Sequence, residues 1–167
     1  MRLLRVIFPI YILTYSSLVG AQDLTADIVT RVMDSLYEVM EPVMASGIST
    51  VVMFPPDKQF APKVNTVEYV KQNNKEVYDQ MNTAAKRFGF VSSESWAQFA
   101  DRISNAELLL QREADGTMIP DIPPNAVVNL GPSREAGLLY LELIRALNNV
   151  PTQDKEVVAP LVPLFFE

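Results

Sequence analysis

Apolar residues recur every three or four positions in four stretches of the chain, a spacing typical of amphipathic helices. The first stretch begins after Asp23 or Thr25, either of which can cap a helix. Because its apolar arc is wide, we expect this helix to lie deep in the fold, with a kink or a new start at Pro42. Its two rows are Ile28, Val32, Leu36, Val39 and Val43, and beside them Met33, Tyr37, Met40 and Met44.

The second and third stretches predict two long helices, which open at Asn65 or Thr66 and at Ser92 or Ser93. The second runs to a left-handed stop at Gly89. Asn74 is the one polar member of its stripe. It either fixes the register of a neighbouring helix or is a polar group near a bend. Because the link between the two helices is short, we expect them to be antiparallel. Their stripes are Val67, Val70, Asn74, Val77, Met81, Ala84 and Phe88, then Trp96, Phe99, Ile103, Ala106 and Leu110.

The fourth stretch predicts a helix that is capped by Ser133 and ends near Asn149. It is apolar over much of its circumference, so we expect it to pack centrally. Residues 48–54 could form a strand or a helix, and a helix is favoured because no partner strand is visible. The pattern therefore predicts an all-α domain over residues 22–150, a four-helix bundle of up-down or orthogonal type with long proline-bearing loops. An extended apolar tail is expected over residues 151–167.

The first 21 residues are typical of a signal peptide rather than of a folded element. Arg2 and Arg5 precede a mostly apolar stretch from Val6 to Val19, and small residues end at Ala21. An uncleaved membrane anchor is the alternative, but a spanning helix needs about 20 apolar residues and this stretch is shorter. We therefore expect cleavage after Ala21 and a periplasmic or secreted protein with no transmembrane span.

Composition and charge exclude several classes of function. The 167 residues include no cysteine and no histidine, which rules out Ser-His-Asp and Cys-His triads and zinc sites built from thiolate or imidazole ligands. The chain carries 20 acidic and 14 basic residues, and loss of Arg2 and Arg5 with the leader changes its net charge from −6 to −8. Such a chain is repelled by nucleic acids and by anionic lipids. We expect no cofactor and no metal.

A short motif at the predicted start of the third helix suggests one enzymatic alternative. Ser93-Glu94-Ser95-Trp96 resembles the glutamate-serine element of lysozyme-like lytic transglycosylases. The resemblance implies that Glu94 is a general acid of raised pKa and that peptidoglycan is the substrate. It covers four residues, and the nearest match to the family's Gly-Leu-Met-Gln element, residues 137–140, lacks the glutamine. As a simpler interpretation, Ser93 caps the helix, Glu94 faces its dipole and Trp96 is core.

Two further groups of residues have both a functional and a structural interpretation. Asp27, Asp34, Glu38 and Glu41 share one face of the first helix and could form a weak cation-binding strip, but a solvated face with intrahelical pairs to Arg31 is favoured. The methionines could line an adaptable binding surface. Their spacing favours core packing instead.

These patterns lead to a binding function rather than an enzymatic one. No complete catalytic constellation occurs, so we expect an exported envelope protein that binds another envelope protein, in a chaperone-like or assembly role. Small apolar ligand binding, such as a lipid, is the first alternative, and peptidoglycan cleavage is the second. The predicted partner-binding residues lie in two proline-flanked apolar segments. They are Ile48, Val51, Val52 and Phe54 in the first segment and Leu161, Leu164, Phe165 and Phe166 in the second.

Overall fold

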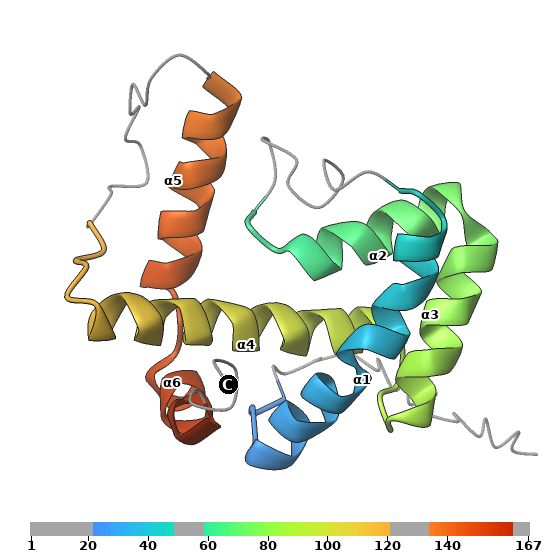
Figure 1. Cartoon of the computed structure of the whole chain (residues 1–167), viewed down its shortest axis with the longest axis horizontal. Helices are drawn as coiled ribbons and strands as arrows, with labels where there is room; N and C mark the ends of the chain where they lie inside the picture. The colour runs from blue at the N-terminus through green and yellow to red at the C-terminus, as the bar shows by residue number, and fades with distance from the viewer. Residues whose placement is uncertain (1–21, 49–58, 121–133, 162–167) are drawn as a thin grey trace, which may run out of the picture.

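The computed structural model describes residues 22–48, 59–120 and 134–161, which form six helices and no strand (Figure 1). The prediction of an all-α fold is confirmed for these residues, although six helices replace the expected four. None of these helices is long and apolar enough to cross a membrane. In chain order the helices are α1 (Ala26–Ala45), α2 (Pro62–Asn73), α3 (Lys75–Arg87), α4 (Ser93–Ala114), α5 (Arg134–Asn148) and α6 (Thr152–Val158).

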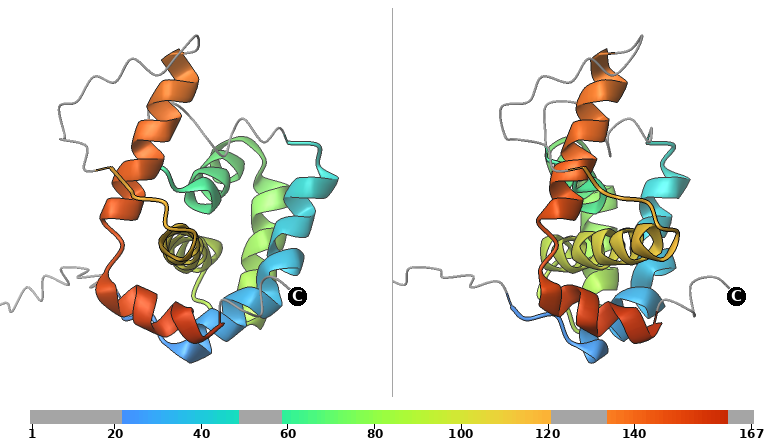
Figure 2. Two further views of the ribbon diagram at one scale, coloured as in Figure 1. Left: turned by 60° about the vertical axis from the view of Figure 1, so that its left-hand side comes forward. Right: turned by 90° about the vertical axis from the view of Figure 1, so that its left-hand side faces the viewer.

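Helix α4 is the centre of the fold, because each of the other five helices packs against it. Figures 1 and 2 show it crossing the middle of the molecule, with α1 and α3 at one end and α5 at the other. Its small residues let neighbouring helices approach closely, while its large side chains fill the spaces between them. The buried residues along α4 include Trp96, Ala97, Phe99, Ala100, Ile103 and Ala106.

Helix α1 begins as predicted, but it does not lie deep in the fold. Thr25 is its N-cap, and the Thr25 hydroxyl accepts a hydrogen bond from the Ile28 backbone N–H at 3.3 Å. The helix continues through Pro42 without a new start. Only one of its two apolar rows is core, since α3, α4 and α6 cover one side of the helix. Leu36, predicted to lie in the buried row, is exposed.

The predicted second helix is two helices, which meet at Asn74. The backbone of Asn74 leaves the helical region, with φ −147° and ψ 83°, and its side-chain oxygen accepts a hydrogen bond from the Val77 N–H at 3.2 Å. Asn74 therefore ends α2 and caps α3, so the bend is the correct one of its two interpretations. Helix α2 also begins earlier than predicted, at Pro62. Proline suits the first turn of a helix because it has no N–H to leave unsatisfied.

A buried carboxylate on α4 supplies the cap that α2 lacks. Ala61 precedes α2 and offers no side-chain hydrogen bond. Instead, the two oxygens of Asp101 accept hydrogen bonds from the backbone N–H groups of Lys63 and Val64, each at 3.0 Å. Burial raises the pKa of Asp101, although these two N–H groups and the charge of Lys63 offset part of that rise. The contact fixes the start of α2 against the middle of α4.

The link between α3 and α4 turns the chain sharply at Gly89, which has a φ of 81°. Ser92, rather than Ser93, is the N-cap of α4 and accepts a hydrogen bond from the Ser95 N–H. Figures 1 and 2 show that α3 lies across α4, so the prediction of an antiparallel pair is wrong. A short link does not oblige two helices to run side by side, because one left-handed residue can redirect the chain.

The last two helices differ most from their predictions. Helix α5 packs only against α4 among the described helices and projects from its end, so it is not central (Figure 1). Residues 152–158 form α6 rather than an extended tail, and α6 packs on α4 and α1. Asp154, which is fully buried, accepts two hydrogen bonds from Arg102 of α4, at 2.9 and 2.7 Å. This bidentate pair holds α6 in place.

Candidate functional site

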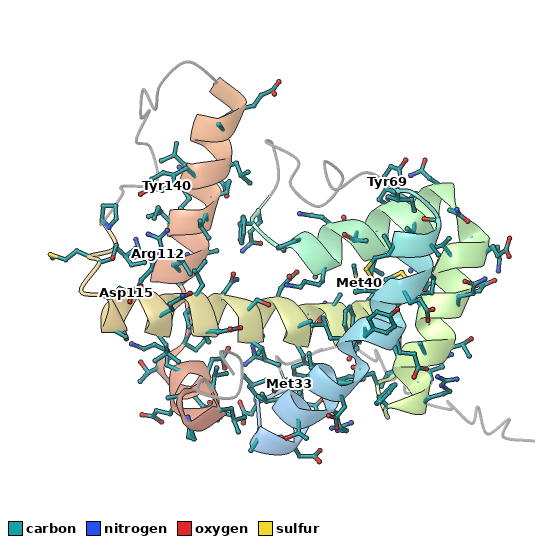
Figure 3. All side chains as sticks on the ribbon, in the orientation of Figure 1. Met33, Met40, Tyr69, Arg112, Asp115 and Tyr140 are labelled. Carbon is teal, nitrogen blue, oxygen red and sulfur yellow. The ribbon has the colours of Figure 1, made fainter. Side chains whose placement is uncertain are left out.

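An apolar stripe on α1 is exposed on the side of the helix that none of the other described helices covers. We define the α1 stripe as Met33, Leu36, Tyr37, Met40 and Met44, five residues on adjoining turns of one face. Leu36, Tyr37 and Met44 are 44%, 71% and 57% exposed, while Met33 and Met40 are half-buried and pack partly against the core. Figure 3 shows Met33 and Met40 on the same side of α1. A contiguous apolar row on a helix surface is a feature of protein-binding sites.

A groove with charged walls runs beside the stripe, between α1 and α3. Its volume is about 740 Å³. Within it, Arg87 forms an ion pair with Glu38, and Lys75 forms one with Asp79. Glu41 and Glu76 form no hydrogen bond or ion pair with any described residue. The side chains that line the groove are four carboxylates, two cations, Gln80, Thr83 and Ala84, with the carboxylates coming from Glu38, Glu41, Glu76 and Asp79.

Two long-range contacts hold α1 firmly beneath the stripe. The Trp96 indole N–H of α4 donates a hydrogen bond of 2.8 Å to the hydroxyl of Ser35, and both side chains are fully buried. At the other side of α1, the Arg31 guanidinium donates to the carbonyls of Phe88 and Gly89 at the end of α3. The predicted intrahelical pair also forms, between Arg31 and Asp27 at 2.9 Å. The stripe is therefore presented by a fixed helix.

Glu94 lies in the first turn of α4, but its surroundings do not suit a general acid. Its carboxylate accepts hydrogen bonds from Lys71 Nζ at 2.6 Å and from the Tyr78 hydroxyl at 2.9 Å. Burial alone would raise the pKa of Glu94, but the hydrogen bonds from Lys71, from its own backbone N–H and from Tyr78 outweigh burial and lower the pKa to about 2. A carboxyl group with this pKa is ionised at neutral pH and has no proton to donate. The raised pKa that the resemblance implied is absent.

Few of the predicted partner-binding residues can be placed. Ile48 and Leu161 are half-buried and pack against the core rather than standing free. Val51, Val52, Phe54, Leu164, Phe165 and Phe166 lie outside the described residues. A binding role for the two segments therefore stays a prediction.

A smaller cleft lies between the start of α2 and the middle of α4. Its volume is about 320 Å³, and Phe60, Val64 and Phe99 give it apolar walls. Asp101 and Arg102 lie at its edge, where both are already engaged in the contacts that fix α2 and α6. Within the described part of the chain, no group of three acidic side chains could hold a metal ion. Among the described residues, this cleft offers apolar walls to a small ligand.

Sequence reasoning missed the α1 stripe because it assigned the methionines to the core. Met81 is fully buried as expected, yet Met44 and Met118 are exposed. One sequence signal could have found the stripe. The apolar arc of α1 spans two rows, which is wider than the face that α3, α4 and α6 cover. An apolar arc of that width leaves one row over for solvent or for a partner.

Comparisons with known proteins identify no relative of this chain. No protein-family model matches it, and no curated protein and no solved structure shows significant similarity to it.

Proposed function

We propose that this protein acts by binding another protein through the α1 stripe, in a chaperone-like or assembly role and without enzymatic activity. The observation that carries the proposal is the exposure of Leu36, Tyr37 and Met44 on a helix that is otherwise well anchored. Burial of apolar area contributes about 25 cal/mol per Å², so a partner that covers these side chains gains binding energy. The unbranched side chains of the methionines in the α1 stripe can adapt to partners of different shape.

The place of action that we propose is the bacterial envelope or the medium outside the cell. Its support is the leader-like pattern of residues 1–21, with cleavage after Ala21. We expect the intact mass of the protein recovered from its source cells to correspond to a chain that begins at Gln22. A mass that corresponds to a chain beginning at Met1 would contradict export with processing.

Photo-crosslinking in the source cells tests the binding function. A photoreactive benzophenone amino acid replaces Tyr37 or Met44 in the stripe, and Val91 or Met118 in two control variants. The control positions are 83% and 89% exposed, so they are at least as accessible as the stripe but lie on other elements. We expect one and the same protein to be captured from both stripe positions and from neither control. Equal capture at all four positions would contradict a site on α1.

Binding of a small apolar ligand is a second candidate, which the 320 Å³ cleft beside Phe60 and Phe99 favours. That volume lies at the lower end of the range for small-molecule sites. Native mass spectrometry of the purified protein distinguishes the two candidates. A carried ligand adds roughly a few hundred daltons to the mass, whereas a protein-binding module without cargo shows the mass of the chain alone. The substitution Val64→Trp, which fills the cleft, should remove any such added mass.

A further inference from the structure

We propose that the segment that docks on the α1 stripe is a cationic amphipathic helix of the partner, with its apolar face on the stripe and its basic residues over the groove between α1 and α3. This inference rests on the proposed function and adds the chemistry of the partner to it. It follows from the length of the stripe, from the carboxylates beside it and from the rigidity of α1.

The stripe has the dimensions of a helix-binding surface. From Met33 to Met44 it covers three turns of α1, or about 16 Å at 1.5 Å per residue. A partner helix that carries apolar residues at positions i, i+3 or i+4, i+7 and i+11 places one anchor on each turn. The unbranched side chains of Met33, Met40 and Met44 can adjust to the shape of those anchors. A surface of this kind accepts an apolar helix face more readily than an extended strand, because no sheet edge is available among the described residues.

The charges next to the stripe select a cationic partner. Asp34 precedes Tyr37 by three residues and Glu41 follows it by four, so one carboxylate lies a turn before the ring and one a turn after it. Glu76 of α3 lines the same groove as Glu41. None of these three carboxylates forms a hydrogen bond or ion pair with a described residue, unlike Glu38 and Asp79. Lysine or arginine side chains of a docked helix would meet them directly.

The anchoring of α1 favours such a complex, since a surface that is already ordered loses little conformational freedom on binding. Ser35 faces the core and accepts from Trp96, while Arg31 is tied to the end of α3. Three carboxylates beside the stripe, which pair with no residue in the described part of the chain, oppose the alternative of an anionic membrane surface. The observations therefore favour a protein helix as the occupant.

The experiment measures binding of two fluorescein-labelled peptides to the purified protein by fluorescence anisotropy. Both peptides have about 18 residues, enough for five helical turns. Both carry leucines on one face, with lysines on the other face of the first peptide and glutamates on the other face of the second. We expect the lysine peptide to bind at least tenfold more tightly than the glutamate peptide, with an advantage that shrinks at high salt.

Matched variants assign that binding to the proposed surface. Asp34→Asn, Glu41→Gln and Glu76→Gln together remove the three unpaired carboxylates, while Asp23→Asn, Asp115→Asn and Glu156→Gln remove the same charge from exposed sites elsewhere. We expect the first triple variant to bind the lysine peptide about tenfold more weakly and the second to change binding less than twofold. The variant Tyr37→Ser with Met44→Ser should weaken binding of the lysine peptide similarly, and Val91→Ser with Met118→Ser should not. Unchanged circular dichroism checks that each variant is folded.

The outcomes separate failure of this inference from failure of the proposed function. If both peptides bind equally and only the stripe variant weakens them, the stripe binds protein without selecting charge, and the cationic partner is wrong. If the control triple variant weakens binding as much as the groove variant, the attraction belongs to the acidic molecule as a whole, and the inference is again wrong. If the partner captured from Tyr37 presents no basic helix, the inference fails although the proposed function stands. If the stripe variant alters neither peptide binding nor capture in cells, both fail.

Discussion

At the scale of single residues, the hydrogen bond from Trp96 to Ser35 is a fully buried polar contact between α4 and α1. Ser35→Ala removes the acceptor and leaves a buried indole N–H without a partner, which we expect to cost about 1–3 kcal/mol of unfolding free energy. Trp96 is the only tryptophan, so its fluorescence reports both the unfolding curve and its own surroundings. The matched control is Ser46→Ala at the exposed C-cap of α1, where the serine hydroxyl donates only to the nearby Val43 carbonyl. Equal stability of the two variants would contradict this account.

The low pKa of Glu94 makes the stability of the folded protein depend on pH in the acidic range. Its folded-state pKa of about 2 lies below its ordinary value of 4.5, so the unfolded state binds more protons as the pH falls. The contribution of Glu94 to stability is therefore complete above about pH 5 and is lost as the pH falls from 4.5 through 2. Because Lys71 and part of Glu94 are exposed, solvent screening reduces that contribution to about 1 kcal/mol.

Urea unfolding at several pH values measures this effect. We expect Glu94→Gln to lower the unfolding free energy by about 1 kcal/mol at pH 7 and by much less at pH 3, where the unaltered protein has itself lost most of the contribution. Glu156→Gln, on an exposed part of α6, serves as the control for removal of one carboxylate. A peptidoglycan digestion assay accompanies these curves. Muropeptide release that Glu94→Gln abolishes would restore the enzymatic alternative.

At the scale of helices, the sequence predicts where helices exist better than it predicts where they end or pack. Thr25 and Gly89 are local signals whose physics acts within a few residues, and both were interpreted correctly. At Asn74 one helix ends and another begins, although apolar residues keep the same helical spacing on both sides. The spacing of apolar residues therefore could not reveal this break. The exposed row of α1 was missed for a related reason. Spacing shows which residues share a face, but the position of α3 and α4 determines which face is covered.

The start of α2 offers a test at the same scale, because its cap comes from another helix. Asp101→Ala leaves the N–H groups of Lys63 and Val64 without their acceptor, and we expect a loss of about 2 kcal/mol in unfolding free energy. Hydrogen exchange at these two amides should quicken more than exchange in α3. The control is Asp115→Ala, at the exposed end of α4 (Figure 3). Unchanged exchange at the start of α2 would show that water replaces the carboxylate at no cost.

At the scale of the whole molecule, α4 packs against five helices, three of which are not adjacent to it in the sequence. The contacts of α1 with α6 and of α2 with α4 bring together distant parts of the chain. Such pairings follow from the total shape of the core, which explains why the central position was assigned to α5 from its composition. Leu141, Ile144 and Leu147 of α5 are buried, yet they lie apart from the main core cluster. The apolar residues of a helix show that other parts of the chain cover it, but they do not show its position in the fold.

The peripheral position of α5 predicts uneven stability across the molecule. A helix with one helical neighbour can open locally without disturbing the rest. We expect backbone amides in the middle of α5 to exchange with deuterated water at least tenfold faster than those in the middle of α4. Native-state hydrogen exchange followed by mass spectrometry measures both helices in one sample. Equal protection of the two would indicate that α5 unfolds only together with the core.

The guanidinium of Arg102 joins the two ends of the described fold. While two of its nitrogens hold Asp154, the third donates a hydrogen bond of 2.8 Å to the Gln22 carbonyl, so the beginning of the described fold and its final helix meet at one side chain. A circular permutant should therefore fold, with a short glycine-serine bridge from Leu161 back to Gln22 and new termini at the exposed Asp115-Gly116 turn. We expect its circular dichroism to match that of the original chain. A folded permutant would show that the contacts between helices, rather than the order of the helices along the chain, determine this fold.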